Sequence, residues 1–352
     1  MSPRLRLRLH MRQRGAALLT AMIIVTLIAS LAAGMVWQQY RAVQIEAADR
    51  ARAQSAWILQ GALDWARLIL KEDANLHRTN KPMDHLGEPW AVPLAEARLS
   101  TFLAADKSTA SEDDGPEAFL SGSIEDAQSR YNLRALLGGN KVPELEQRVL
   151  ERLCSQVNAP PGTAAVIIAG LREAFPAAAS GGTTGTGTAT GSAGAASGAG
   201  GGTTTPTKES GPLEPAGLDQ LTWLGLTPDT IARLQPFVVL LPKATPVNLN
   251  TAPREVIAAL FDGVDLATAE RLVQGRKAKP MGDVSTDAAA YLPAAALAQA
   301  TATRASVISS FFIVTGRLRL EERQLEQRSL IERQNLNMVV LARERINQLV
   351  DR

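Results

Sequence analysis

The chain contains 352 residues, enough for more than one folded unit, and 45% of them are hydrophobic. Its formal net charge is +2, but five of its 37 basic residues lie in the first 15 positions. The remainder carries 32 basic against 35 acidic residues, a balance with no overall attraction for nucleic acid. A single cysteine, Cys154, excludes an intramolecular disulfide, and its apolar neighbours predict a buried side chain.

The first predicted element is a membrane-spanning helix from Ala16 to Trp37. This segment reads AALLTAMIIVTLIASLAAGMVW and contains no charged residue. In helical form it spans about 33 Å, which matches the hydrocarbon core of a bilayer. The five arginines before it predict a cytoplasmic N-terminus and an extracytoplasmic remainder.

Three interpretations of this segment stand beside one another. It could be a cleavable signal peptide with a cleavage site in ASLAA at 29–33, or a plain membrane anchor. The third rests on RQRG, which abuts the apolar run and resembles the leader of type IV prepilins and type II secretion pseudopilins. The resemblance implies a leader at 1–15, cut after Gly15 by a prepilin peptidase, with Ala16 as the N-methylated new terminus.

The fifth residue after this boundary is Thr20, where most pilins carry a glutamate. A lone carboxylate in hydrocarbon is costly, and in pilins it pairs with the terminal amine of a neighbouring subunit. A subunit without it is poorly suited to the repeating body of a filament. Among pseudopilins, the K subunit is the one that usually lacks this glutamate.

The helix is predicted to continue to Lys71, because residues 38–71 contain no proline and only one glycine. Its second half is amphipathic, so we expect it to pack on a folded domain and to offer a surface for partners. Trp57 and Trp65 lie at apolar positions of this half and are interpreted as core anchors.

The remaining chain predicts an α+β fold in which helices interrupt an antiparallel sheet. A strand is expected at 119–124 and further strands within 311–352, where apolar and polar residues alternate in SSFFIVTGRLRL. The pilin-like domain would thus comprise 38–132 and 311–352, and a helical insertion 133–310. The insertion includes a Gly/Thr/Ser linker at 176–212.

The stretch TPVNLNTAPREVIAALFDGVDLATAERLVQ predicts two helices joined at Gly263. Asn250 or Thr251 is expected to cap the first helix. The pair resembles the helix-hairpin-helix units of competence DNA receptors, which bind a phosphate through a glycine hairpin. Asp262 and Asp265 flank this hairpin, and their charges should repel DNA, so nucleic acid is not the expected partner.

Three stretches, one of them part of this helical pair, resemble the general secretion pathway protein K family. They are LTWLGLTPDTIARLQPFVVLLP, VNLNTAPREVIAAL and SGSIEDAQSRYNL. The resemblance implies a pilin-like sheet with a SAM-like helical insertion, and a minor pseudopilin at the tip of the type II secretion pseudopilus. It would nucleate or cap the filament for export of folded proteins across the outer membrane. The implied partners are the I and J minor pseudopilins and the inner-membrane assembly platform.

The resemblance also implies a calcium site in the pilin-like domain. Its candidate ligands are Glu125, Asp126 and Asn132, since calcium prefers oxygen ligands. The alternative is that Glu125 and Asp126 only solvate a turn. A less specific acidic cluster stands at 112–114.

The sequence shows no pattern typical of an enzyme. His77 and His85 lack the spacing of a zinc protease motif, and no nucleophile elbow, phosphate loop or paired-cysteine motif is present. We therefore expect no catalytic residues. The rival to the secretion role is a minor type IV pilin with a function in DNA uptake or adhesion through its helical hairpin.

Overall fold

The structure is a computed structural model that describes residues 14–99, 118–139, 141–176, 213–320 and 323–349. Most of the predicted leader and linker, and the acidic cluster at 112–114, lie outside these residues. The chain divides into two compact units, residues 1–60 and 61–352. Each unit is described by itself.

Helix α1 runs from Arg14 to Leu76 without interruption. It begins two residues before the predicted start and ends five residues after the predicted end. The absence of proline explains its continuity, because proline would remove a backbone hydrogen bond and clash with the preceding turn. Residues 14–60 belong to the first unit and residues 61–76 to the second.

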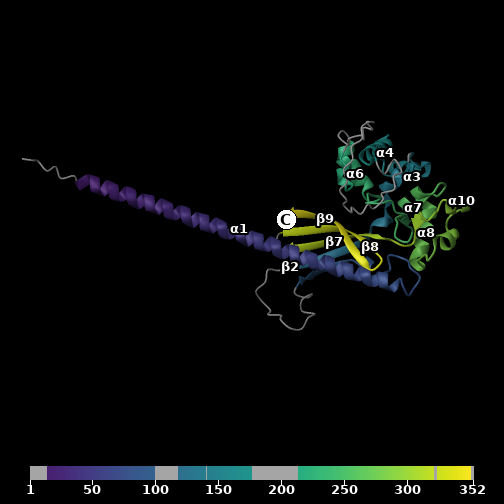
Figure 1. The fold of residues 1–352 in the computed structure, drawn as a ribbon, viewed down its shortest axis with the longest axis horizontal. Coiled ribbons are helices and arrows are strands. Elements are labelled where there is room, and N and C mark those ends of the chain that lie inside the picture. Colours follow the sequence, from purple (N-terminus) through teal and green to yellow (C-terminus); the bar gives the residue numbers. More distant parts are fainter. Residues whose placement is uncertain (1–13, 100–117, 140, 177–212, 321–322, 350–352) are drawn as a thin grey trace, which may run out of the picture. The chain divides into compact units, whose positions relative to one another are not determined.

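The second unit contains a five-stranded antiparallel sheet in the order β1-β2-β7-β8-β9 (Figure 1). The strands are β1 (Leu94–Arg98), β2 (Ala118–Asp126), β7 (Phe311–Leu320), β8 (Arg323–Gln334) and β9 (Asn337–Leu349). Alternating residues of β7 face opposite sides of the sheet, as the sequence pattern predicts. Strands β2 and β7 are adjacent, although most of the insertion separates them along the chain.

One face of the sheet packs against the end of α1. Leu63, Ala66, Leu70 and Ala74 recur at helical spacing and are buried against Phe312, Val314, Ile331 and Met338 of the sheet. Trp90, in the short helix η1 (Pro89–Ala91), completes this core with its ring centroid 5.3 Å from that of Phe312.

The interpretation of Trp57 and Trp65 as core anchors is wrong, because their exposed fractions are 76% and 63%. Both tryptophans are apolar and lie at helical spacing, yet leucines and alanines fill the face of residues 61–76 that meets the sheet. Leucine and alanine side chains are smaller than tryptophan, and they fill the space between the helix and the strands. The bulkier tryptophans are left on the outside.

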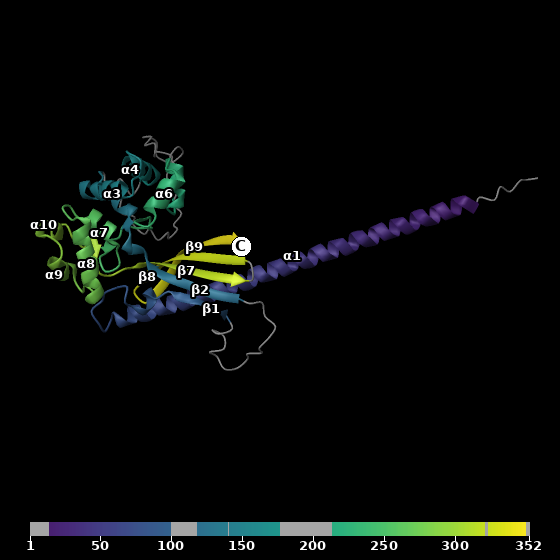
Figure 2. The same cartoon turned by 180° about the vertical axis from the view of Figure 1, so that it is seen from behind.

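The helical insertion occupies the chain between β2 and β7 and has a core of its own (Figure 2). Its longer helices are α3 (Glu144–Gln156), α4 (Thr163–Ala174), α6 (Pro228–Leu234), α7 (Arg254–Leu260) and α8 (Leu266–Ala278). Shorter ones are η2 (Ala127–Ser129), η3 (Leu133–Leu137), η4 (Asp219–Leu224), α9 (Val284–Asp287), η5 (Ala288–Ala290) and α10 (Ala294–Leu297). Cys154 is buried in this core, as predicted.

Two small parallel ladders join distant parts of the insertion. Strand β3 (Tyr131–Asn132) pairs with β4 (Val238–Val239), and β5 (Val247–Asn248) pairs with β6 (Ala305–Ser306). The described residues therefore form a long apolar helix, an antiparallel sheet and a helical insertion, which confirms the predicted α+β fold class.

Candidate functional site

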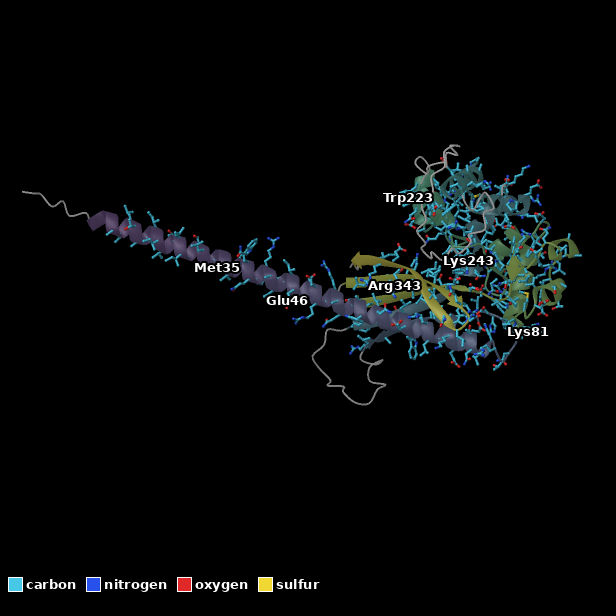
Figure 3. The ribbon with its side chains drawn as sticks, in the orientation of Figure 1. Met35, Glu46, Lys81, Trp223, Lys243 and Arg343 are labelled. Atoms are coloured by element: carbon cyan, nitrogen blue, oxygen red, sulfur yellow. The ribbon has the colours of Figure 1, made fainter. Side chains whose placement is uncertain are left out.

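The first candidate surface is the apolar part of α1 in the first unit. Its large apolar side chains are exposed on all sides of the helix (Figure 3). They include Leu18, Leu19, Met22, Ile23, Ile24, Val25, Leu27, Ile28, Leu31, Met35, Val36 and Trp37. A helix that is apolar all round requires an apolar environment. Among the described residues, α1 is the one helix long and apolar enough to span a bilayer.

The hydroxyl groups of this segment are satisfied within the helix. Thr20 donates to the carbonyl oxygen of Ala17 at 3.0 Å, and Thr26 and Ser30 bond in the same way to the residues three positions earlier. Local bonds of this kind lower the cost of placing a hydroxyl in hydrocarbon. Thr20, where a pilin glutamate is usual, thus finds its acceptor within its own helix.

The predicted processing site lies at the start of the described helix. Gly15 and Ala16 belong to the first turn of α1, which begins at Arg14. The first N–H groups of a helix have no intrahelical acceptor, so this turn is held by fewer hydrogen bonds than the middle of α1. Cleavage after Gly15 and methylation of Ala16 stay predictions.

A second apolar surface lies on α1 within the second unit. Trp65, Leu68 and Leu76 are exposed, with Trp65 and Leu68 three positions apart and Leu76 eight positions beyond the latter. This spacing places them on one side of the helix, and we call these three residues the apolar stripe. Leu70 and its neighbours on the other side are buried against the sheet. Residues 61–76 therefore have one packed apolar face and a second face on which these three apolar side chains are exposed beside Glu72.

A buried polar network joins the sheet to the insertion around Asp126, at the end of β2. Its Oδ2 atom accepts hydrogen bonds from the hydroxyls of Thr251 and Ser309, both at 2.6 Å, and from Asn248 Nδ2 at 3.0 Å. Its Oδ1 atom accepts from the backbone N–H of Gln128 at 2.8 Å. Burial raises the pKa of Asp126 to about 6, and the bonds from Ser309, Thr251 and Gln128 oppose the shift.

This network brings together two sequence stretches that the family resemblance singled out. SGSIEDAQSRYNL supplies Asp126, and VNLNTAPREVIAAL supplies Asn248 and Thr251. Ser309, which leads into β7, was not singled out by the sequence. The expectation that Asn250 or Thr251 caps α7 is wrong. Pro253 occupies the cap position of α7, and the Thr251 hydroxyl bonds to Asp126 instead.

The candidate calcium ligands have separate partners in the structure. Glu125 forms an ion pair with Arg130 at 2.6 Å, whereas both oxygens of Asp126 accept bonds from the network. Asn132 Oδ1 accepts from the backbone N–H groups of Arg134 and Leu241 at 3.1 and 3.2 Å. Calcium needs six or more oxygens directed at one point. Each of these three side chains thus already has a hydrogen-bond or ion-pair partner in this arrangement.

The helical hairpin of the insertion contains two carboxylate side chains, Asp262 and Asp265. Asp262 pairs with Arg148 and Arg152 of α3 at 2.8 and 2.5 Å. Asp265 caps α8 by accepting from the backbone N–H of Thr268 at 2.8 Å. Gly263 between them has φ of 78°, a conformation that favours glycine. The two carboxylates thus occupy the hairpin where a bound phosphate would need N–H groups and positive charge.

One buried ion pair of the insertion was not predicted from the sequence. Arg304 Nε lies 2.6 Å from Glu146 Oε1, and the Tyr131 hydroxyl donates to Glu146 Oε2 at 2.9 Å. A further Arg304 nitrogen donates to the carbonyl oxygen of Leu260 at 2.7 Å. The pair joins α3 to the end of the insertion. No local pattern marks residues that meet across 158 positions.

Comparisons with known proteins identify proteins with similar sequences. Residues 247–308 match the family described as Type II secretion system (T2SS), protein K. The type II secretion system protein K of Pseudomonas aeruginosa is 29% identical over 75% of this chain and 72% of its own length. Its counterpart from Klebsiella pneumoniae is 29% identical over 94% of this chain and 96% of its own length.

A solved structure has the same fold. It is a chain in the crystal structure of the GspK-GspI-GspJ complex from the type 2 secretion system of enterotoxigenic Escherichia coli. The TM-score is 0.59 at 20% sequence identity, with 86% of this chain and 99% of that chain covered.

Proposed function

We propose that this chain, a member of the type II secretion system protein K family, is the minor pseudopilin at the tip of a secretion pseudopilus. Proteins of this family are components of a secretion apparatus. The apolar helix of the first unit fits anchoring in the inner membrane. The observation that carries the tip position is Thr20, which bonds to Ala17 where a body subunit would present a carboxylate.

The proposed life cycle begins in the inner membrane. The prepilin peptidase cuts after Gly15, and Ala16 becomes the methylated terminus of a helix that stays in the bilayer. The globular part lies in the periplasm, as the arginines before the helix indicate. The assembly platform then extracts the subunit into the filament, where it nucleates or caps growth and supports export of folded proteins. The protein acts by assembly, without turnover of a substrate.

The I and J minor pseudopilins are the proposed partners, and the apolar stripe is the proposed contact surface. A related chain of the same fold occurs in a complex named for GspK, GspI and GspJ. Trp65, Leu68 and Leu76 expose apolar area on a helix whose other side is already packed. Burial of a tryptophan in an interface contributes a large share of binding energy.

A role in DNA uptake is not favoured. Asp262 is paired with two arginines and Asp265 caps α8, so the hairpin presents carboxylates where a phosphate would bind. A calcium ion at Glu125, Asp126 and Asn132 stays a prediction. Calorimetric titration of the purified chain with Ca²⁺ would test it, and loss of binding in Asp126→Asn would be required.

The partner surface is tested by Trp65→Ala in the full chain, coexpressed with the I and J pseudopilins and purified in detergent. The expected result is at least about a tenfold loss of copurified I and J proteins. Trp223→Ala is the matched control, because Trp223 is also exposed but lies on the insertion (Figure 3). Normal complex formation by Trp65→Ala, or equal loss in both variants, would contradict this contact surface.

A further inference from the structure

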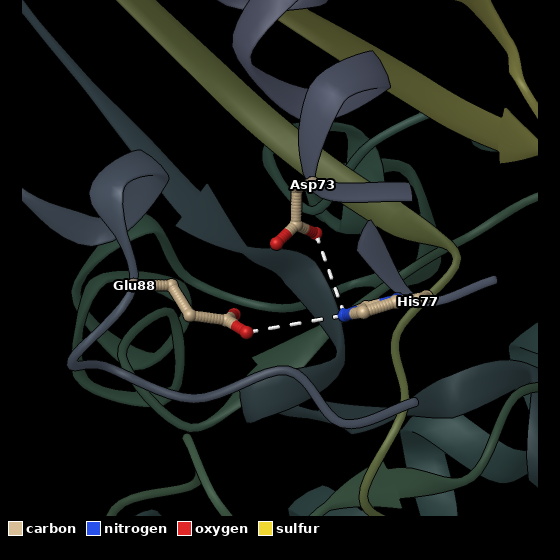
Figure 4. A group of neighbouring side chains, drawn as sticks. All are labelled: Asp73, His77 and Glu88. Atoms are coloured by element: carbon tan, nitrogen blue, oxygen red, sulfur yellow. Dashed lines mark ion pairs between the residues drawn. The ribbon is translucent and has the colours of Figure 1, made fainter. Parts of the chain in front are cut away.

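The end of α1 and the loop that follows it bring together three side chains able to bind a metal. Asp73 lies in the last turn of α1, His77 follows the helix, and Glu88 precedes η1. One ligand atom from each lies within 4.8 Å of the other two. His77 Nε2 is 3.8 Å from Asp73 Oδ2 and 3.9 Å from Glu88 Oε1 (Figure 4).

The imidazole nitrogen at the centre of this group is buried and has no hydrogen-bond partner among the described residues. Its distances to Asp73 and Glu88 are too long for hydrogen bonds. Ligand atoms around a tetrahedral zinc ion lie about 3.4 Å apart, given metal–ligand distances of about 2.1 Å. The two distances from His77 Nε2 would each need to shorten by about half an ångström to reach this spacing.

Glu88 is held in place by groups that leave one of its oxygens free to bind. Its Oε2 atom accepts from Trp90 Nε1 at 2.6 Å and from the backbone N–H of His85 at 3.0 Å. Trp90 is itself buried against Phe312. The other oxygen, Oε1, faces His77 (Figure 4). Metal-ligating carboxylates are typically oriented by such hydrogen bonds.

The charges around this group are not balanced. Asp73, Asp84 and Glu88 contribute three carboxylates, and Arg333 bonds to two of them, Asp73 Oδ2 at 2.7 Å and Asp84 Oδ2. Asp84 is fully buried, and its Oδ1 atom has no partner among the described residues. With His77 neutral, three carboxylates therefore share one guanidinium in a buried region, where uncompensated negative charge is costly. A bound dication would compensate it.

The helix end adds to the preference for a cation. The last turn of α1 contains no basic residue, so nothing on the helix itself complements the partial negative charge of its C-terminus. Asp73 and His77 both lie at this end. A metal ion bound there would be stabilised by the carbonyl dipoles of the helix as well as by the carboxylates.

His85 differs from His77 in its hydrogen bonding. Its Nδ1 atom accepts from the backbone N–H of Gly87 at 3.1 Å, so the proton of the neutral ring lies on Nε2. His85 Nε2, 3.8 Å from Glu88 Oε1, is therefore a donor and not a metal ligand in this arrangement. This leaves one nitrogen and two oxygens as the protein ligands.

We propose that Asp73, His77 and Glu88 bind a divalent transition-metal ion of the zinc class. The ion ties the C-terminal end of α1 to the loop before η1, and water completes its coordination. A nitrogen ligand and only two carboxylates match zinc better than calcium, which takes six to eight oxygens. Its ligands are different residues from the calcium candidates Glu125, Asp126 and Asn132 and from the apolar stripe.

The test is calorimetric titration of the detergent-solubilised full chain with Zn²⁺ after treatment with EDTA. We expect one equivalent of Zn²⁺ with a dissociation constant below about 10 µM. His77→Gln and Glu88→Gln should each weaken binding by about 100-fold, whereas His85→Gln should retain it. Absence of Zn²⁺ binding to the parent chain, equal binding by His77→Gln, or a preference for Ca²⁺ over Zn²⁺ would overturn the proposal.

A spectroscopic readout separates ligand loss from misfolding. Co²⁺ bound to the parent chain should give visible absorption bands that report its coordination. Those bands should disappear in His77→Gln and persist in His85→Gln, with the far-ultraviolet circular dichroism of both variants matching the parent. Should His77→Gln fail to fold, Glu88→Gln decides the question, because Glu88 lies in a loop outside the helix. Unchanged bands in a folded ligand variant would contradict the assignment.

Discussion

The insertion and the helix–sheet part of the second unit bury very different amounts of apolar side chain. Among the described residues, the insertion core contains 37 buried residues, whereas the core between α1 and the sheet contains nine. The insertion also holds the buried pair of Arg304 and Glu146. The helix–sheet part instead leaves Trp65 and Leu68 exposed. The insertion thus has the larger core, and we expect the helix–sheet part to gain more stability than the insertion when its exposed apolar side chains become buried.

The largest loss of stability is expected from a change in the insertion. Arg304→Met leaves Glu146 as an unpaired buried charge, and breaking a buried pair in this way costs about 3–5 kcal/mol of unfolding free energy. Urea denaturation of the full chain in detergent, with hydrogen exchange resolved by region, would measure it. Exchange should increase in α3 and α7 and stay unchanged in β7 to β9.

The matched control is Arg254→Met, which removes an arginine from exposed ion pairs with Glu255 and Glu270. Its unfolding midpoint should equal that of the parent chain, because exposed pairs contribute little. Equal destabilisation of the insertion and the sheet by Arg304→Met would show that the two regions unfold as one, against the comparison drawn above.

The next largest loss of stability is expected in the core between α1 and the sheet. Leu70→Ala creates a cavity between α1 and the sheet and should lower the unfolding free energy by about 2–4 kcal/mol. Leu68→Ala is the control, since this leucine is on the same helix but is exposed, and it should change the free energy little. Thermal unfolding of both variants measures the difference. A larger loss in Leu68→Ala would mean that the opposite face of the helix is the packed one.

A smaller effect is expected at the junction of the two regions. Asp126→Asn replaces Oδ2 or Oδ1 by an amide group that donates hydrogen bonds, so some of its present donors lose their acceptor. The loss should be about 1–3 kcal/mol. Glu125→Gln, in a half-exposed ion pair with Arg130, should be close to neutral. Hydrogen exchange should increase at both β2 and β5 in Asp126→Asn, and a change limited to one of them would argue against a shared junction.

The smallest expected effect concerns the reactivity of Cys154, which reports the packing of the insertion without any substitution. Burial raises the pKa of the Cys154 thiol from 9.0 to about 11. At pH 8 the thiolate fraction is then lower by about 100-fold than that of a free thiol, and alkylation by iodoacetamide should be slower by at least that factor. Urea should restore the normal rate. Rapid alkylation of the native chain would indicate an insertion that opens easily.

Local patterns predicted the elements of this fold better than its contacts. The alternation in SSFFIVTGRLRL located β7, and the absence of proline located most of α1. Helical periodicity did not reveal which apolar face of residues 61–76 would be buried, so Trp65 was placed in the core. Which face of the helix is buried depends on its contacts with the strands. The sequence of the helix alone does not determine these contacts.

The polar contacts were the least predictable part. Asp126 was interpreted as a calcium ligand or a solvated turn residue, because an acid at a strand end has no visible partner in the sequence. Its partner Thr251 is 125 positions away, and Ser309 is 183 positions away. The group around His77 is not predictable from the sequence, because histidine and glutamate eleven positions apart match no metal motif. Asp73, His77 and Glu88 come together because the loop that follows α1 returns to the end of this helix.

The pairing of β2 with β7 has a consequence for how such a molecule could be built. Asp126 lies directly opposite Phe312, so the chain leaves the sheet and re-enters it on neighbouring strands. In topology, the two strands form a hairpin whose connection is the folded insertion. The entropic cost of closing a loop rises only slowly with its length. A two-residue turn could close the same hairpin. Excision of the insertion should therefore yield a shorter chain that keeps its sheet and its apolar helix, so that the insertion could be varied independently of both.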